Sequence, residues 1–100
     1  MLELYQAEWC PYSRRVRMRL TELGVDFVAR QVEAESKDRH AMRERTGRDS
    51  IPVLVTEDGV AIGDFERILD WLDEHFEETP ATDRVRAQIR AHGLEPTPRR

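Results

Sequence analysis

The sequence has little cysteine and no long apolar run, and each shortage excludes a class of protein. Its 100 residues include one cysteine, Cys10, so no disulfide can form within the chain. His40, His75 and His92 stand singly and far from that thiol, so we expect no metal site. No window approaches the about 20 apolar residues that cross a bilayer, and residues 1–6 carry no basic leader. We therefore expect a cytoplasmic protein that does not bind membranes.

Positive charge is also in the minority. The net charge is −4 at pH 7, which argues against a general attraction to nucleic acid. A chain of 100 residues is the size of one domain that can bury a core without disulfides. We divide it into a main domain over 1–79, a C-terminal helical extension of that domain over 80–94, and a flexible tail over 95–100. We expect it to be a monomer.

The first third of the chain predicts a strand, a helix and a second strand. Alternating apolar residues predict a strand that ends near residue 6. Apolar residues at i, i+4 and i+7 predict a helix over 11–23, and Gly24 can end it with a positive φ. The apolar stretch 25–32 predicts the second strand. Because a helix joins the two strands, they should pair in parallel.

The remainder predicts a second helix, a β-hairpin and two further helices. Ser36 can cap a short polar helix over 36–45. Strands over 51–55 and 60–62 flank an Asp-Gly turn, which predicts an antiparallel pair. A strongly amphipathic helix is expected over 65–76 with Asp64 as its N-cap, and Thr82 opens a last helix that Gly93 ends. The predicted order β-α-β-α-β-β-α-α describes an α/β fold with a four-stranded mixed sheet flanked by helices.

Cys10 is the first candidate for chemistry. It lies at the carboxyl end of the first predicted strand and at the start of a helix, where α/β sheets bind their ligands. Unpaired helix N–H groups lower the pKa of a thiol there. Pro11 fixes the turn, Tyr12 can cover the sulfur, and Ser13 can donate a hydrogen bond to a thiolate but cannot form a disulfide. The alternative is a buried structural cysteine, and the flanking Trp9, Pro11 and Tyr12 favour a functional thiol.

Three segments together resemble the glutaredoxin family. Residues 9–13, Trp-Cys-Pro-Tyr-Ser, are similar to its Cys-Pro-Tyr-Cys site with Ser in place of the second Cys, as in monothiol members. Residues 46–52 are similar to its Thr-Gly-x-x-(Thr/Ser)-Val-Pro segment, whose proline is cis and faces the sulfur. Residues 63–66 occupy the place of its Gly-Gly-x-Asp and of the Glu-Ser pair in the N-terminal domain of glutathione transferases. The resemblance covers roughly residues 1–78 and implies a thioredoxin-like fold.

The resemblance also implies a site for glutathione, or a similar small thiol, as co-substrate. A residue before a cis proline has its backbone N–H and C=O free, so Ile51 can pair with the cysteinyl part of glutathione. The helix start at 64–66 presents N–H groups to the γ-glutamyl carboxylate, and Glu66 can accept from the amino group. Arg39, Arg43 or Arg48 can reach the glycyl carboxylate, and the sequence does not choose among them. The predicted site comprises Cys10, Tyr12, Ile51, Pro52, Asp64, Phe65, Glu66 and Arg48.

The sequence departs from the family pattern in the charges near the thiol. Ala7 stands where glutaredoxins usually carry Lys, and Glu8 is beside it, so thiolate and ligand lose a cation. Four arginines of the first helix either compensate or form a solvated face: Arg14, Arg15, Arg17 and Arg19.

Two further departures lie at the start of the helix over 65–76. Asp64 replaces a second Gly, and Phe65 replaces a transferase Ser that helps to hold glutamate. We interpret Phe65 as a core residue of its helix more than as a ligand contact. These changes leave the identity of the small thiol open.

The leading hypothesis is a monothiol glutaredoxin-like enzyme that reduces mixed disulfides of glutathione and proteins through Cys10. A glutathione-transferase-like domain is the alternative, although about 20 residues after the helix over 65–76 are too few for a helical electrophile domain. An iron–sulfur carrier would hold a cluster between two chains with Cys10 and glutathione. Cluster-carrying relatives generally have Gly-Phe after the cysteine, and Pro11 stands there instead. A redox-insensitive adaptor is the last alternative.

Overall fold

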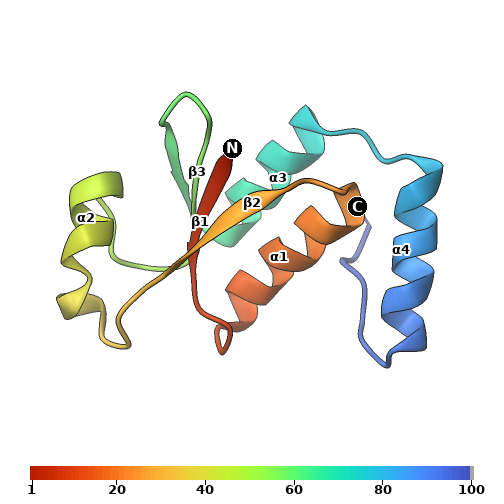
Figure 1. Ribbon diagram of the computed structural model, residues 1–100, viewed down its shortest axis with the longest axis horizontal. Coiled ribbons are helices and arrows are strands. Elements are labelled where there is room, and N and C mark those ends of the chain that lie inside the picture. Colours follow the sequence, from red (N-terminus) through yellow and green to blue (C-terminus); the bar gives the residue numbers. More distant parts are fainter. Residues whose placement is uncertain (100) are drawn as a thin grey trace.

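A four-stranded mixed sheet lies at the centre of the computed structural model, which describes residues 1–99 (Figure 1). The strand order is β2-β1-β3-β4. β1 (Leu2–Gln6) pairs in parallel with β2 (Phe27–Gln31) and antiparallel with β3 (Val53–Val55). β3 in turn pairs antiparallel with β4 (Ala61–Gly63). The predicted parallel pair, the predicted hairpin and the mixed sheet are all confirmed.

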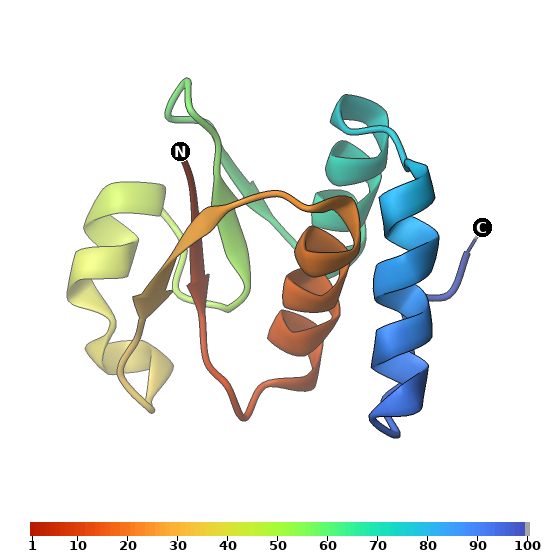
Figure 2. The ribbon, with the colours of Figure 1, turned by 45° about the vertical axis from the view of Figure 1, so that its right-hand side comes forward.

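Helices cover both faces of this sheet, as Figures 1 and 2 show. α1 (Pro11–Leu23) and α3 (Phe65–His75) lie side by side on one face. α2 (His40–Thr46) lies on the other face. α4 (Pro80–Ala91) packs against α1 on the outside of the α1–α3 layer. The element order is therefore the predicted one.

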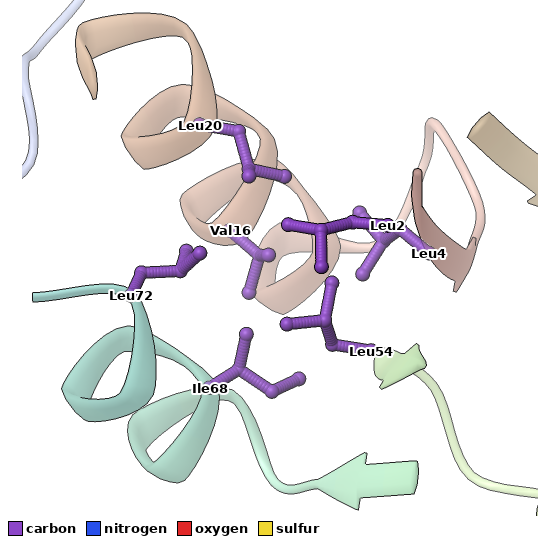
Figure 3. Close-up of a cluster of buried hydrophobic side chains, with 7 residues drawn as sticks. All are labelled: Leu2, Leu4, Val16, Leu20, Leu54, Ile68 and Leu72. Carbon is purple, nitrogen blue, oxygen red and sulfur yellow. The ribbon is translucent and has the colours of Figure 1, made fainter. Parts of the chain in front are cut away.

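Alternation along the strands divides the hydrophobic core between the two faces. Leu4 and Leu54 are register partners, and both point into the layer of α1 and α3, where neither is exposed. Figure 3 shows this main cluster, which consists of Leu2, Leu4, Val16, Leu20, Leu54, Ile68 and Leu72. Burying each such leucine side chain contributes about 1.5–3 kcal/mol. The neighbouring strand residues Tyr5, Val53 and Val55 form a smaller cluster with Met42 of α2.

Local signals placed the boundaries of the first helix correctly. α1 begins at Pro11 and is ended by Gly24, whose φ of 68° lies in the left-handed region that favours glycine. The strands are shorter than predicted. β2 lacks the two ends of the predicted range 25–32, and β3 begins only after the predicted start of 51–55.

The predicted helix over 36–45 is divided in two. Ser36–Asp38 form a 3₁₀ turn, and α2 begins only after Arg39, so Ser36 does not cap it. Arg39 is buried between the two pieces, and its guanidinium donates to the carbonyls of Glu33, Ala34 and Asp49 at 2.8–3.0 Å. A single continuous helix was therefore a wrong prediction, because Arg39 instead satisfies carbonyls of the irregular segments around it.

α4 begins two residues earlier than predicted. Pro80 takes its first position, which needs no N–H donor. Thr82, the expected opening residue, lies inside the first turn, and its Oγ1 accepts a hydrogen bond from the Thr79 amide at 3.1 Å. Thr82 thus takes part in the cap without being the cap residue.

The C-terminal tail differs from the flexible segment predicted over 95–100. Pro96 and Thr97 are buried. The Thr97 amide donates to Oε2 of Glu22 at 2.7 Å, and the Thr97 carbonyl accepts from Nη1 of Arg86 at 2.8 Å. The tail therefore packs against α1 and α4, while Arg100 lies outside the described residues. Within the described residues 1–99, the helices are too short or too polar to span a bilayer.

Candidate active site

Cys10 is the N-cap residue of α1. Its amide donates to the Ala7 carbonyl at 3.1 Å, which closes the loop after β1. Its Sγ accepts a hydrogen bond from the Ser13 amide at 3.4 Å, and Pro11 takes the first helical position. The side chain is 6% exposed. The sulfur therefore lies at the positive end of the helix dipole, which favours an anion.

Ser13 supports this thiol from one turn further along α1. It is fully buried, and its Oγ accepts from the Ala7 amide at 3.4 Å. Burial raises the pKa of the Cys10 thiol, whereas hydrogen bonds from Ser13 and the Tyr12 amide, together with the charge of Arg17, lower it. The hydrogen bonds and the charge together outweigh the effect of burial, so the pKa of Cys10 lies below its usual value. This direction is the one expected for a thiol at a helix N-terminus.

Arg17 is one of four arginines of α1 that the sequence alone does not distinguish. Its Nη1 donates to Oε1 of Gln6 at 2.6 Å and to the Ala7 carbonyl at 3.2 Å. Its Nε pairs with Oε2 of Glu8 at 3.2 Å. Arg17 follows Cys10 by two helical turns, so the spacing i, i+7 was the available signal. For Arg17 the interpretation of a solvated arginine face is wrong.

The Ile51–Pro52 peptide bond is cis, as the resemblance implied. Tyr5 of β1 pairs with Val53 of antiparallel β3, so Pro52 lies at the end of the sheet where β1 leads to Cys10. The pairing of β3 begins at Val53. Ile51 therefore lies outside the ladder, where its backbone could pair with an extended ligand.

The start of α3 carries the predicted N-cap. Asp64 Oδ1 accepts from the Glu66 amide at 3.3 Å, which confirms Asp64 as the cap. Its φ of 68° lies in the left-handed region, where a non-glycine residue is strained. The carboxylate of Asp64 occupies one of the N–H groups expected to receive the γ-glutamyl carboxylate. The side chain of Glu66 is exposed and free to meet a ligand.

The three candidate arginines for the glycyl carboxylate have different surroundings. Arg39 is buried against backbone carbonyls, and Arg43 pairs with Asp49 at 3.0 Å. The Arg48 side chain lies over Gly63, where an added Cβ would approach Nη1 within 2.6 Å. Arg48, Gly63 and Asp64 help to line a cavity of about 290 Å³. Of the three, Arg48 is the one that lines this cavity.

Tyr12 and Phe65 join the start of α1 to the start of α3. Their rings stack with centroids 4.8 Å apart, and Tyr12 is 52% exposed. Tyr12 thus leans on Phe65. Phe65 also packs against the main hydrophobic cluster, as predicted, and the Arg15 guanidinium lies 5.0 Å from its ring centroid. Phe65 belongs both to the core and to the rim of the site.

Metal ligands do not gather at this site or elsewhere in residues 1–99. No group of three or more His, Cys, Asp or Glu side chains in this described part of the chain could hold a metal ion.

A mixed sheet with an activated cysteine at the start of α1 and a cis proline before β3 defines a thioredoxin-like α/β protein. The family model for "Glutathione S-transferase, N-terminal domain" matches residues 4–80. The chain therefore belongs to this family.

Individual relatives come from both glutaredoxins and transferases. "Glutaredoxin 3" of Escherichia coli strain K12 is 33% identical over 53 residues, which cover 53% of this chain and 64% of that protein. A glutathione S-transferase structure from Rhodospirillum rubrum F11 is 31% identical with a TM-score of 0.67, covering 91% of this chain and 42% of that one. Another from Methylobacillus flagellatus KT, with GSH bound, is 27% identical with a TM-score of 0.65, covering 81% and 38%. The chain thus spans under two thirds of the glutaredoxin and under half of each transferase structure.

Proposed function

We propose that the protein is a monothiol glutaredoxin-like enzyme that reduces mixed disulfides between glutathione and proteins. The observation that carries this proposal is the position of Cys10, whose sulfur lies at the N-terminus of α1 with hydrogen bonds that lower its pKa. A thiolate is the nucleophile in disulfide exchange. The sequence has no second cysteine, so the second thiol must come from solution.

The proposed cycle has two exchanges. The Cys10 thiolate attacks the glutathione sulfur of the mixed disulfide, an S–S bond forms between Cys10 and glutathione, and the protein thiolate leaves with the bonding electrons. The thiolate of a second glutathione then attacks the sulfur of the bound glutathione. This step releases oxidised glutathione and restores the Cys10 thiolate. The net reaction converts the mixed disulfide and one glutathione thiol into the free protein thiol and oxidised glutathione.

The residues around Cys10 suggest how glutathione would be held. The backbone of Ile51 is free to pair with its cysteinyl part, as expected for a residue before a cis proline. Arg48 offers a cation to a carboxylate, and Glu66 offers an acceptor to the amino group. The coarser property, a thioredoxin-like protein of the glutathione transferase and glutaredoxin type, stands on the comparisons.

Cys10→Ser tests the proposal directly. A serine fits the same space, so the variant should fold, but its hydroxyl cannot attack the disulfide. The measurement is the release of free peptide from a glutathionylated peptide in the presence of glutathione. We expect the variant to lose all rate above the uncatalysed reaction, with its unfolding midpoint nearly unchanged. Full retained activity in Cys10→Ser would exclude the mechanism.

A transferase reaction is the second candidate, favoured by the family match over residues 4–80. Here the protein would lower the pKa of glutathione itself, and glutathione would attack a carbon electrophile. Conjugation of glutathione to a chloronitrobenzene separates the two candidates. The transferase predicts conjugation that survives Cys10→Ser, whereas the oxidoreductase predicts none above background.

A further inference from the structure

A cavity of about 290 Å³ lies between the first turns of α1 and the C-terminal tail. This volume is at the lower end of the range for small-ligand sites, which suits one side chain. Its apolar lining comes from both segments, with Met18 on α1 and Leu94, Pro96 and Pro98 on the tail. Leu94 is 52% exposed. The cavity therefore offers an apolar surface beside the first turns of α1.

The tail that forms the outer wall is fixed by a buried polar network. Glu22 of α1 is fully buried and accepts from the Thr97 amide at 2.7 Å. Arg86 of α4 pairs with the same carboxylate at 3.2 Å and donates to the Thr97 carbonyl at 2.8 Å. The hydroxyl of Thr97, a lining residue, is buried without a hydrogen-bond partner among the described residues. The outer wall of the cavity is thus held in place by α1 and α4.

The arginines of α1 divide into two pairs. Arg17 and Arg19 are bound to acidic side chains. Within the described residues, Arg14 and Arg15 have no acidic partner, and both line the cavity. Among the described residues, Glu95 is the one acid in the lining, so the described lining carries a net positive charge on a chain whose total is −4. This local charge favours an acidic partner that the rest of the surface would repel.

The cavity lies within reach of a peptide whose disulfide is at Cys10. The amide of Arg14 donates to the Cys10 carbonyl at 3.0 Å. Along the axis of α1, Arg14 and Met18 are about 6 and 12 Å beyond Cys10 at 1.5 Å per residue. An extended peptide advances about 3.3 Å per residue, so this span corresponds to about two to four residues.

Resting on the proposed function, we propose that this cavity selects the protein substrate. It would hold an apolar side chain about two to four residues from the glutathionylated cysteine, with an acidic neighbour facing Arg14 and Arg15. The substrate class is therefore a glutathionylated segment that combines an apolar residue with acidic residues near its cysteine.

Three glutathionylated peptides test this inference. The first has Leu three residues from the cysteine on both sides, each beside Glu. The second replaces Glu by Lys, and the third replaces Leu by Gly. We expect kcat/KM of the first to exceed the other two about fivefold or more, because one ion pair and one partly buried leucine are lost in turn. The mixed disulfide of glutathione and mercaptoethanol serves as the substrate that cannot reach the cavity.

Two variants connect the preference to the cavity. Arg14→Gln should reduce the Glu-over-Lys preference, and Leu94→Ser should reduce the Leu-over-Gly preference, each to within about twofold. Both should turn over the mercaptoethanol mixed disulfide normally. Arg84→Gln removes the same charge from an exposed site on α4 outside the cavity and should change neither preference. Equal rates for the three peptides, or a preference that survives both variants, would overturn the inference.

A binding measurement keeps this test separate from the proposed function. The same three peptides with Ser in place of the modified cysteine cannot react, and fluorescence anisotropy gives their Kd. If the wild-type protein fails to reduce any mixed disulfide but binds the Leu-Glu peptide tightest, the reaction is wrong and the cavity is supported. If it reduces the mercaptoethanol disulfide but shows no peptide preference, the reaction is supported and the cavity assignment fails.

Discussion

Two arginines on α1, Arg17 and Arg19, are separated by one residue and serve different regions of the molecule. Arg17 contacts Gln6, Ala7 and Glu8, the segment that leads to Cys10, and 19% of its side chain is exposed. Arg19 is 8% exposed and points away from the thiol, toward acidic residues of α1, α3 and the segment before α4. The same helix thus carries one arginine that contacts the segment before Cys10 and one that pairs with acidic residues near the C-terminal extension. The sequence alone does not separate these roles, because both residues are arginines of the same helix.

Glu22→Ala should have the largest effect, and it acts on the region that Arg19 serves. Glu22 is fully buried and pairs with Arg19 and Arg86. Its removal leaves two buried guanidinium groups without that carboxylate and the Thr97 amide without an acceptor. We expect a loss of about 3–5 kcal/mol in the free energy of unfolding by urea. At temperatures where the variant is folded, the pKa of Cys10 should remain at the wild-type value. A shift in this pKa would show that the two regions are coupled.

Arg17→Met tests the other half of the comparison. Losing the positive charge should raise the pKa of Cys10 toward its usual value. At pH values below the pKa of Cys10 less thiolate is present, so the rate with a small disulfide should fall. The fall should be modest, because the charge of Arg17 is the smallest of the influences that lower this pKa. Above the pKa values of both proteins the two rates should converge. The measurement is the pH dependence of thiolate absorbance and of the rate.

Arg17→Lys is the matched control, because it keeps the charge and loses the forked hydrogen bonds. It should retain most of the lowered pKa. If Arg17→Met and Arg17→Lys raise the pKa of Cys10 equally, the effect comes from loop geometry, and the electrostatic role assigned to Arg17 is wrong.

Asp64→Gly is expected to have a smaller effect on stability, because two changes oppose each other. Glycine relieves the strain at φ 68°, worth about 1 kcal/mol or more. It also loses the cap to the Glu66 amide, which costs a few tenths of a kcal/mol for a replacement by Gly. The freed N–H should tighten glutathione binding, measured by calorimetry. Weaker binding would show that the Asp64 carboxylate itself contacts the ligand.

Arg99→Gln should have the smallest effect. Arg99 pairs with Glu78 and Asp83 at the exposed edge of the C-terminal region. Exposed ion pairs are screened by solvent and salt, so the urea midpoint should not move measurably. Glu22 and Arg99 belong to the same charged region and differ in burial, so the contrast between the two variants isolates the effect of burial.

The sequence carried enough local information to predict most of the fold. The periodicity of Val16, Leu20 and Leu23 and the glycine at 24 predicted α1, and the Asp-Gly turn predicted the hairpin. At the site, Cys10 as a helix-cap thiol and Asp64 as an N-cap were also readable, because caps depend on neighbours within a few residues.

Partners far apart in the sequence were not readable. Arg39 was considered as a ligand contact, yet its guanidinium is buried against three carbonyls of irregular segments. The predicted flexible tail is held by Glu22, which lies 75 residues before Thr97. No period or motif marks such a pair, because its residues meet only after the intervening elements have packed.

The hydrogen bond from the Thr97 amide to Glu22 makes this amide a probe of how the C-terminal tail opens. An amide that is buried and bonded to a carboxylate exchanges its hydrogen with solvent only when the surrounding structure opens. For the Thr97 amide, this opening must separate the tail from α1 and disturb the Arg86 contact at once. Its protection factor therefore measures how readily the tail detaches from α1 and α4. Agreement with the slowest amides of the sheet would mean that the tail detaches only when the whole domain unfolds.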